Sequence, residues 1–207
     1  MTGPHHAIED EVIHTRLADG HRVCIRAISE KDRDIMREGI AALSPQSRYL
    51  RFFSAAPAQP ESVLDKLLDT GGVDHLAWGA IDMASPEPRA IGAVHAIRPD
   101  EGGNHEFSIA VIDDFHGKGL GTLLTVVTLA HGRALGIAAV EAYAMMENSP
   151  AIGLLAALGA DRIATERAVA HYRLEVAPAL ERARAIRRGK VLDASVASAI
   201  AQLERHF

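Results

Sequence analysis

The segment that most constrains this chain is HEFSIAVIDDFHGKGLGT, at residues 105–122. Apolar residues alternate at its start, which predicts a strand, and a helical apolar pattern follows from Leu120. Glycines occupy positions 117, 119 and 121 between the two. Glycine lets a backbone approach a ligand closely, and the free amides at a helix start favour anions. The segment therefore predicts a strand, a turn that binds a phosphate-bearing ligand, and a helix.

The remaining chain predicts an α/β fold of one domain. An Asp19-Gly20 pair between two alternating segments is typical of a hairpin, and helix starts fall at Ser29, Ser44-Pro45 and Pro60. Strands are expected at 12–17, 21–26, 75–83, 89–98, 105–111, 137–145, 162–166 and 168–176, and longer helices at 120–135 and 149–158. Short connections before the glycine turn predict antiparallel strands, and the strand–helix–strand unit after it should be parallel. We expect a mixed, mostly antiparallel sheet with helices on both faces.

Residues 1–10 are expected to be a flexible tail, 11–176 the domain, and 177–207 a C-terminal extension of two helices. An apolar stripe in the second helix is formed by Leu192, Val196, Ile200 and Leu203. Basic residues crowd the first helix, at positions 182, 184, 187, 188 and 190. They predict either a solvated helix face or docking onto an acidic partner or a second copy of the chain, as a homodimer.

Composition limits the partners. The formal net charge is −5, which gives no reason to expect nucleic acid. No apolar run approaches a membrane span, and the N-terminus lacks the apolar core of a secretion signal. The single Cys24 excludes an internal disulfide framework, and the eleven histidines show no metal-ligand spacing. We expect a cytoplasmic protein without metal, nucleic-acid or membrane partners.

Two familiar nucleotide-binding patterns fit the glycine turn poorly. A dinucleotide fold places its turn after the first strand of a parallel unit, with an acid about 20 residues later. Glu141 stands near that distance, but antiparallel strands are expected before this turn. A phosphate-binding Walker loop requires Gly-Lys-Ser or Gly-Lys-Thr, whereas Lys118 precedes Gly119.

The arrangement instead resembles the GNAT acetyltransferase superfamily. Its pyrophosphate turn, Gln/Arg-x-x-Gly-x-Gly/Ala, corresponds to residues 116–121, with His116 at the first position. Asn148, Ala151 and Gly159 match a second motif, in which Ala160 replaces the usual Phe. The resemblance implies acetyl-CoA as co-substrate, with its pyrophosphate on the backbone of 117–122 and its pantetheine arm along the preceding strand. The implied binding residues are Ile109, Ala110, Val111, His116, Gly117, Lys118, Gly119, Leu120, Gly121, Thr122 and Asn148.

Within the superfamily, four segments are similar to the GNAT domain of bacterial protein lysine acetyltransferases: IRAISEKD, LSPQSRYLRFF, HEFSIAV and MMEN. This similarity spans roughly residues 12–176. It implies transfer of an acetyl group to a protein lysine. The alternatives are acetylation of a small amine, and a non-catalytic module that binds acyl-CoA.

Glu106 is the candidate general base, matching the acid that opens this strand in the lysine acetyltransferases. A lysine amine with a pKa of about 10.4 is mostly protonated at neutral pH and needs a base before it can attack a thioester. Strand alternation places Glu106 with Ser108 and Ala110, and the opposite face, including Ile109 and Val111, should be core. Because Glu106 and Val111 lie roughly 16 Å apart along a regular strand, the reacting carbon should sit near Ser108 to Ala110. The alternative for Glu106 is a structural ion pair with an arginine.

One difference from the family pattern concerns the residue that protonates the leaving thiolate. Many relatives use a tyrosine seven residues after the motif asparagine to protonate the thiolate, and Leu155 stands at that position here. Thiols with a pKa near 8.5 are tolerable leaving groups without such an acid.

Overall fold

The computed structural model describes residues 10–84, 87, 89–186 and 189–205. The tail expected at 1–10 lies outside this part of the chain except for Asp10, as do Arg187 and Arg188 of the basic cluster.

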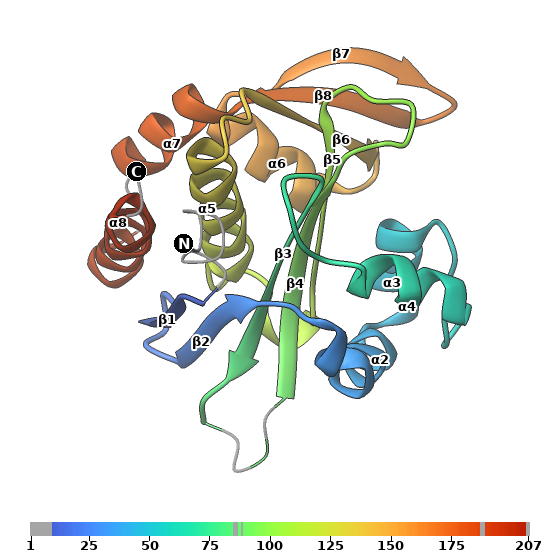
Figure 1. Ribbon diagram of the computed structural model, residues 1–207, viewed down its shortest axis with the longest axis horizontal. Helices are drawn as coiled ribbons and strands as arrows, with labels where there is room; N and C mark the ends of the chain where they lie inside the picture. The colour runs from blue at the N-terminus through green and yellow to red at the C-terminus, as the bar shows by residue number, and fades with distance from the viewer. Residues whose placement is uncertain (1–9, 85–86, 88, 187–188, 206–207) are drawn as a thin grey trace.

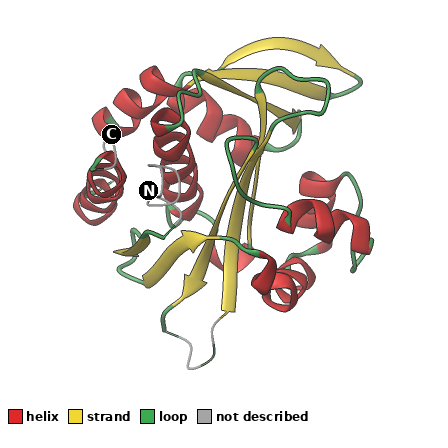
Figure 2. Ribbon diagram, in the orientation of Figure 1, coloured by secondary structure: helices red, strands yellow, loops and turns green. Residues whose placement is uncertain are grey.

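The fold is built on an eight-stranded sheet (Figures 1 and 2). Its strands are β1 (Val12–Arg16), β2 (Arg22–Ala27), β3 (His75–Asp82), β4 (Arg89–Ile97), β5 (His105–Val111), β6 (Ala139–Met145), β7 (Asp161–Glu166) and β8 (Val169–Glu175). The spatial order is β1-β2-β3-β4-β5-β6-β8-β7. All neighbours are antiparallel except β5 and β6, which are parallel and joined through a helix. The predicted mixed, mostly antiparallel sheet is confirmed.

Helices cover both faces of the sheet (Figure 1). One face carries the 3₁₀ turn η1 (Glu30–Asp32), α2 (Arg33–Ala42), α3 (Pro45–Phe52) and α4 (Glu61–Leu68). The other carries α5 (Leu120–Ala134), α6 (Ser149–Leu158), α7 (Val176–Ala185) and α8 (Lys190–Glu204), and the 3₁₀ turn η2 (Asp113–Phe115) precedes α5. A single helix was expected from Ser29. The structure instead has η1 first, with the Ser29 amide donating to Asp32 Oδ2 at 2.8 Å.

Local signals explain most of these boundaries. The Ser44 hydroxyl accepts a hydrogen bond from the Ser47 amide at 3.1 Å, and Pro45 occupies the first turn of α3. Gly159 ends α6 in the left-handed region, with φ of +83°. The hairpin at Asp19-Gly20 connects β1 and β2 as predicted.

Helix α5 is the centre of the core. It is buried over most of its circumference, because β3, β4 and β5 lie on one side of it and α7 and α8 on the other. The apolar stripe of α8, at positions 192, 196, 200 and 203, belongs to this same core. The cation of Arg184 on α7 pairs within the chain, with Glu181 at 2.6 Å and with Glu204 on α8.

Candidate active site

Strands β5 and β6 separate soon after they meet. The pairing between them consists of His105 with Val140 and Glu106 with Glu141. Beyond Glu106, the edge of β5 that faces β6 is therefore unpaired along residues 107–111. Backbone N–H and C=O groups on such an edge are available to an extended ligand. This is the opening in the ladder that a pantetheine arm requires.

A cleft of about 530 Å³ runs along this edge to the start of α5. Every residue predicted to bind the cofactor lines it except Lys118: Ile109, Ala110, Val111, His116, Gly117, Gly119, Leu120, Gly121, Thr122 and Asn148. Ile109 and Val111 pack against the core, as alternation predicted. Both are only half-buried, because the separation of β6 also leaves them open to the cleft.

The glycine turn depends on backbone conformation. Gly117 and Gly119 have φ of +72° and +88°, in the left-handed region that L-residues disfavour. The amides of the first turn of α5 have no partner within the helix, so they form an anion site. The β1–β2 hairpin supports the turn from outside, since the Ala18 amide donates to the Lys118 carbonyl at 2.9 Å. Lys118 itself points to Asp19, with 3.1 Å between Nζ and Oδ2.

His116 and Asn148 hold the two sides of the cleft. The Nε2–H of His116 donates to the Val111 carbonyl at 2.8 Å, which ties the turn back to the end of β5. The Asn148 Oδ1 accepts from the Ala151 amide at 3.2 Å and so caps α6.

Helix α3 lies along β5 in the opposite direction. Its start is fixed by Asp113, just after β5, which accepts from the Ser44 amide at 3.0 Å, the Ser44 hydroxyl at 2.7 Å and the Ser47 hydroxyl at 3.0 Å. Burial opposes the charge of Asp113, yet these hydrogen bonds hold its pKa below the usual value. The last turn of α3 then places Arg51 in the lining of the cleft, where it is electrostatically coupled to Glu106 at the beginning of β5.

Glu106 is exposed on the face of β5 that also carries Ser108 and Ala110. No ion pair within 4.0 Å involves its carboxylate among the described residues, although the alternative from sequence was an arginine partner. Arg51 interacts with Glu106 only electrostatically, and the pKa of Arg51 falls to about 10 because burial outweighs the attraction of Glu106.

Two buried histidines lie behind this region. His75 Nδ1–H donates to the Asp69 carbonyl at 2.7 Å, so its Nε2 accepts from His95 Nδ1–H at 3.0 Å. His95 is paired across the sheet with Ser108. Burial, with the charges of Arg51 and His75, holds the pKa of His95 well below its usual value, so the ring is neutral at pH 7.

An acidic and aromatic group lies beside Glu106, on the same side of the sheet. Glu141 accepts from Asn104 Nδ2 at 2.8 Å and contacts His171 Nε2 at 2.7 Å, and the Asn104 bond is the main reason for its lowered pKa. Tyr143 stacks on His171 with 4.3 Å between ring centroids and remains 47% exposed. Burial, followed by the charges of Glu141 and Glu106, raises the pKa of Tyr143.

Several cleft residues were not predicted from sequence. They are Ala18, Leu43, Ser47, Leu50, Arg51, Phe115, Pro150, Ala151, Leu154, Ala157 and Leu192. The segment LSPQSRYLRFF supported the family resemblance without identifying Arg51 as a site residue, and nothing local links Leu192 to the glycine turn. Leu192 packs so closely on Gly119 that a Cβ built there would lie 2.2 Å from Leu192 Cδ2.

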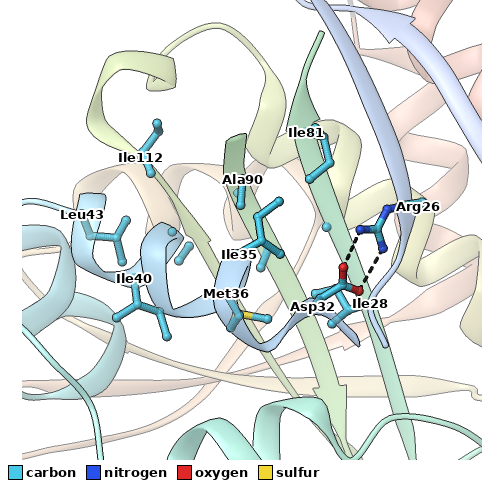
Figure 3. Close-up of a pocket in the computed structure, with 15 residues that line it drawn as sticks. Arg26, Ile28, Asp32, Ile35, Met36, Ile40, Leu43, Ile81, Ala90 and Ile112 are labelled. Atoms are coloured by element: carbon cyan, nitrogen blue, oxygen red, sulfur yellow. Dashed lines mark hydrogen bonds and ion pairs between the residues drawn. The ribbon is translucent and has the colours of Figure 1, made fainter. Parts of the chain in front are cut away.

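A second cavity, of about 60 Å³, lies between α2 and the sheet (Figure 3). Ile35, Met36 and Ile40 of α2 face it, and the ion pair between Arg26 and Asp32 closes one end. This cavity is almost wholly apolar and too small for a nucleotide. It has neither the volume nor the polar groups of a cofactor site.

Among the described residues, no cluster of three or more His, Cys, Asp or Glu side chains has an arrangement that could hold a metal ion. Within the same part of the chain, none of the helices is both long and apolar enough to span a membrane.

The open β5–β6 edge, the glycine turn and the cleft together form one continuous open site. Residues 22–161 match the family described as acetyltransferase (GNAT) domain. The chain belongs to this acetyltransferase family, as the resemblance in sequence implied.

Three individual proteins are similar to this chain in sequence or in structure. The acetyltransferase PA5475 of Pseudomonas aeruginosa is 31% identical over 118 residues, which cover 57% of this chain and 63% of that protein. The chain thus spans less than two thirds of the length of this relative. The GNAT domain of S. lividans PAT superposes with a TM-score of 0.72 at 21% identity, covering 79% of this chain and 96% of that one. Spermidine N-acetyltransferase from Vibrio cholerae, solved with CoA and spermine, gives 0.58 at 17%, over 76% and 98%.

Proposed function

We propose that this chain transfers the acetyl group of acetyl-CoA to an amine, with a protein lysine as the acceptor. The observation that carries the proposal is the free edge of β5. One end of that edge leads to the glycine turn at the start of α5, and the other end carries Glu106. The free edge of β5 thus connects the glycine turn, which would bind the phosphates, with the exposed carboxylate of Glu106. The space between them has room for a thioester.

The binding residues follow from the cleft. The amides of Gly117 to Thr122 would hold the pyrophosphate, and the open backbone of Ile109 to Val111 would pair with the pantetheine arm. A volume of about 530 Å³ and a partly apolar lining suit a ligand of this kind. Acetyl-CoA would supply an activated acyl carbon. The protein would supply the general base and hold the thioester in place.

Glu106 would take the proton of the incoming ammonium group, directly or through one water molecule. Because Glu106 is exposed, it can pass this proton to solvent before the chemical step. The neutral nitrogen then attacks the thioester carbon and forms the C–N bond, Glu106 takes the second amine proton, the C–S bond breaks, and the second proton also leaves to solvent. A backbone N–H on the free edge of β5 would stabilise the negative charge that develops on the carbonyl oxygen.

The region around Glu106 favours a cationic acceptor. Glu141 and Tyr143 lie on the same side of the sheet, and both the negative charge and the aromatic face attract an ammonium group. Tyr143 on β6 and Met146 just after it are exposed large apolar side chains. An open surface with exposed apolar groups suits a polypeptide better than a small enclosed amine.

The second candidate is a polyamine acceptor. The charges of Glu106 and Glu141 support it, since two carboxylates on neighbouring strands can bind a chain with two ammonium groups. A non-catalytic module that only binds acyl-CoA is the third candidate.

One experiment separates these candidates. CoA release is measured with acetyl-CoA and three acceptors: lysine peptides, spermidine and an aminoglycoside. Turnover with the peptides supports the proposal, and turnover confined to the small amines rejects the lysine acceptor. Thermal stabilisation by acetyl-CoA without turnover on any acceptor would indicate the binding module. Stabilisation by NAD alone would refute the cofactor.

A further inference from the structure

We infer that Arg51 is a further catalytic residue, whose guanidinium stabilises the CoA thiolate as it leaves. This inference rests on the proposed function. It assigns the task that the resemblance in sequence gives to a tyrosine in many members of the family. The corresponding residue here, Leu155, is buried in the core and carries no polar group.

The position of Arg51 follows from how α3 is held. Asp113 ties the start of the helix to the glycine-turn end of β5, through Ser44 and Ser47. The helix then continues along the strand, so its last turn lies near the other end, beside Glu106. Arg51 therefore lines the cleft at the end where the thioester is expected, away from the amides expected to hold the pyrophosphate.

The guanidinium of Arg51 lies against an aromatic ring but has no anionic partner. It lies over the ring of Phe52, 4.7 Å from the ring centroid, in an attractive cation–π contact. It makes no hydrogen bond or ion pair with the described residues, and Glu106 acts on it only from beyond ion-pair distance. A half-buried cation without a partner is costly for folding, and it is typical of a site that receives an anion.

The groups that face Arg51 restrict the kind of anion that its guanidinium can receive. Glu106 on β5 and His95 on β4 are its electrostatic neighbours, and His75 on β3 lies behind His95. Both histidines have lowered pKa values because of burial, so neither adds positive charge at pH 7. The charge that appears in this space during the reaction is the electron pair left on sulfur when the C–S bond breaks. Glu106 takes both amine protons in turn and passes them to solvent, so the sulfur departs as a thiolate beside Arg51.

The test uses binding of CoA as well as turnover. In the complex with CoA, the thiol is titrated by the ultraviolet absorbance of its thiolate. With wild type, its pKa should fall by about one unit or more below that of free CoA titrated in the same way. Arg51→Gln should return it to the free value, and Arg51→Lys should give an intermediate value. Arg37→Gln is the matched control, because Arg37 pairs with Asp34 and Glu61 on the surface and does not line the cleft.

Turnover gives the second readout. Arg51→Gln should lower turnover at saturating acetyl-CoA by about 100-fold, comparable with loss of another preorganised electrostatic group, and leave acetyl-CoA affinity within about threefold. An unchanged thiol pKa together with unchanged turnover would overturn the role. A large loss of affinity with normal turnover at saturation would also overturn it, since it would make Arg51 a phosphate ligand. A wild type that binds CoA without turnover refutes the proposed function, and the thiol titration still decides the position of Arg51. If wild type does not bind CoA, both proposals are wrong.

Discussion

Replacement of Gly119 by alanine tests how the glycine turn and α8 depend on each other. Two effects act at this position. Its φ of +88° costs alanine about 1–2 kcal/mol, as any left-handed L-residue does. The added Cβ would also lie 2.2 Å from Cδ2 and 2.8 Å from Cδ1 of Leu192, a side chain that is only 4% exposed. Relieving such an overlap in a packed core costs about 1–3 kcal/mol more.

Gly117→Ala is the matched comparison. Gly117 has a similar φ of +72°, but no atom lies within 4 Å of a Cβ built there. The structure therefore predicts a loss of about 1–2 kcal/mol for Gly117→Ala and about 2–5 kcal/mol for Gly119→Ala. Urea unfolding measures both values, with fluorescence of the single, fully buried Trp78 as the signal.

A double-mutant cycle isolates the contact. Leu192→Ala alone should cost about 2–5 kcal/mol as a cavity mutation. In that background, the cost of Gly119→Ala should fall to that of Gly117→Ala, which corresponds to a coupling of about 1–3 kcal/mol. Equal losses for the two glycine variants, or additivity of Gly119→Ala with Leu192→Ala, would refute the packing of α8 on the turn.

Three further predictions concern single side chains. Glu106→Gln should lower turnover by at least about 100-fold, the usual scale for a general base, with acetyl-CoA affinity near normal in isothermal titration; unchanged turnover would remove Glu106 from this role. Lys118→Ala should leave acetyl-CoA affinity within about threefold, because Lys118 points to Asp19 and an exposed pair contributes little; a tenfold loss would place Lys118 on the ligand. Asp32→Asn should lower the free energy of unfolding by about 1.5–3 kcal/mol at pH 7, because it removes charged hydrogen bonds to Arg26 and the Ser29 amide. Although burial opposes ionisation, these bonds lower the pKa of Asp32 in the folded state, so the difference from wild type should be full above about pH 4 and disappear as pH falls through the folded pKa. A difference that does not shrink in urea titrations as the pH falls below about 4 would contradict this explanation.

Much of the site was predictable because its elements are local. The glycine turn, the strand before it and the cap at Asn148 depend on residues within a few positions of one another, where backbone preferences and hydrogen bonds act directly. The same is true of the hairpin at Asp19-Gly20 and the helix start at Ser44-Pro45. The sequence therefore determined the order of strands and helices, the family, and about half of the residues that line the cleft.

The tertiary structure decided which distant side chains meet. Separation of β5 from β6 opened Ile109 and Val111 to the cleft, although alternation alone places them in the core. The direction of α3 brought Arg51 beside Glu106, and burial of the apolar stripe of α8 brought Leu192 onto Gly119. No local pattern encodes these contacts, because they arise when amphipathic helices bury their apolar faces against a common sheet and only one relative placement fills the space. The chain thus specifies the glycine turn by itself, and the packed fold determines what surrounds it.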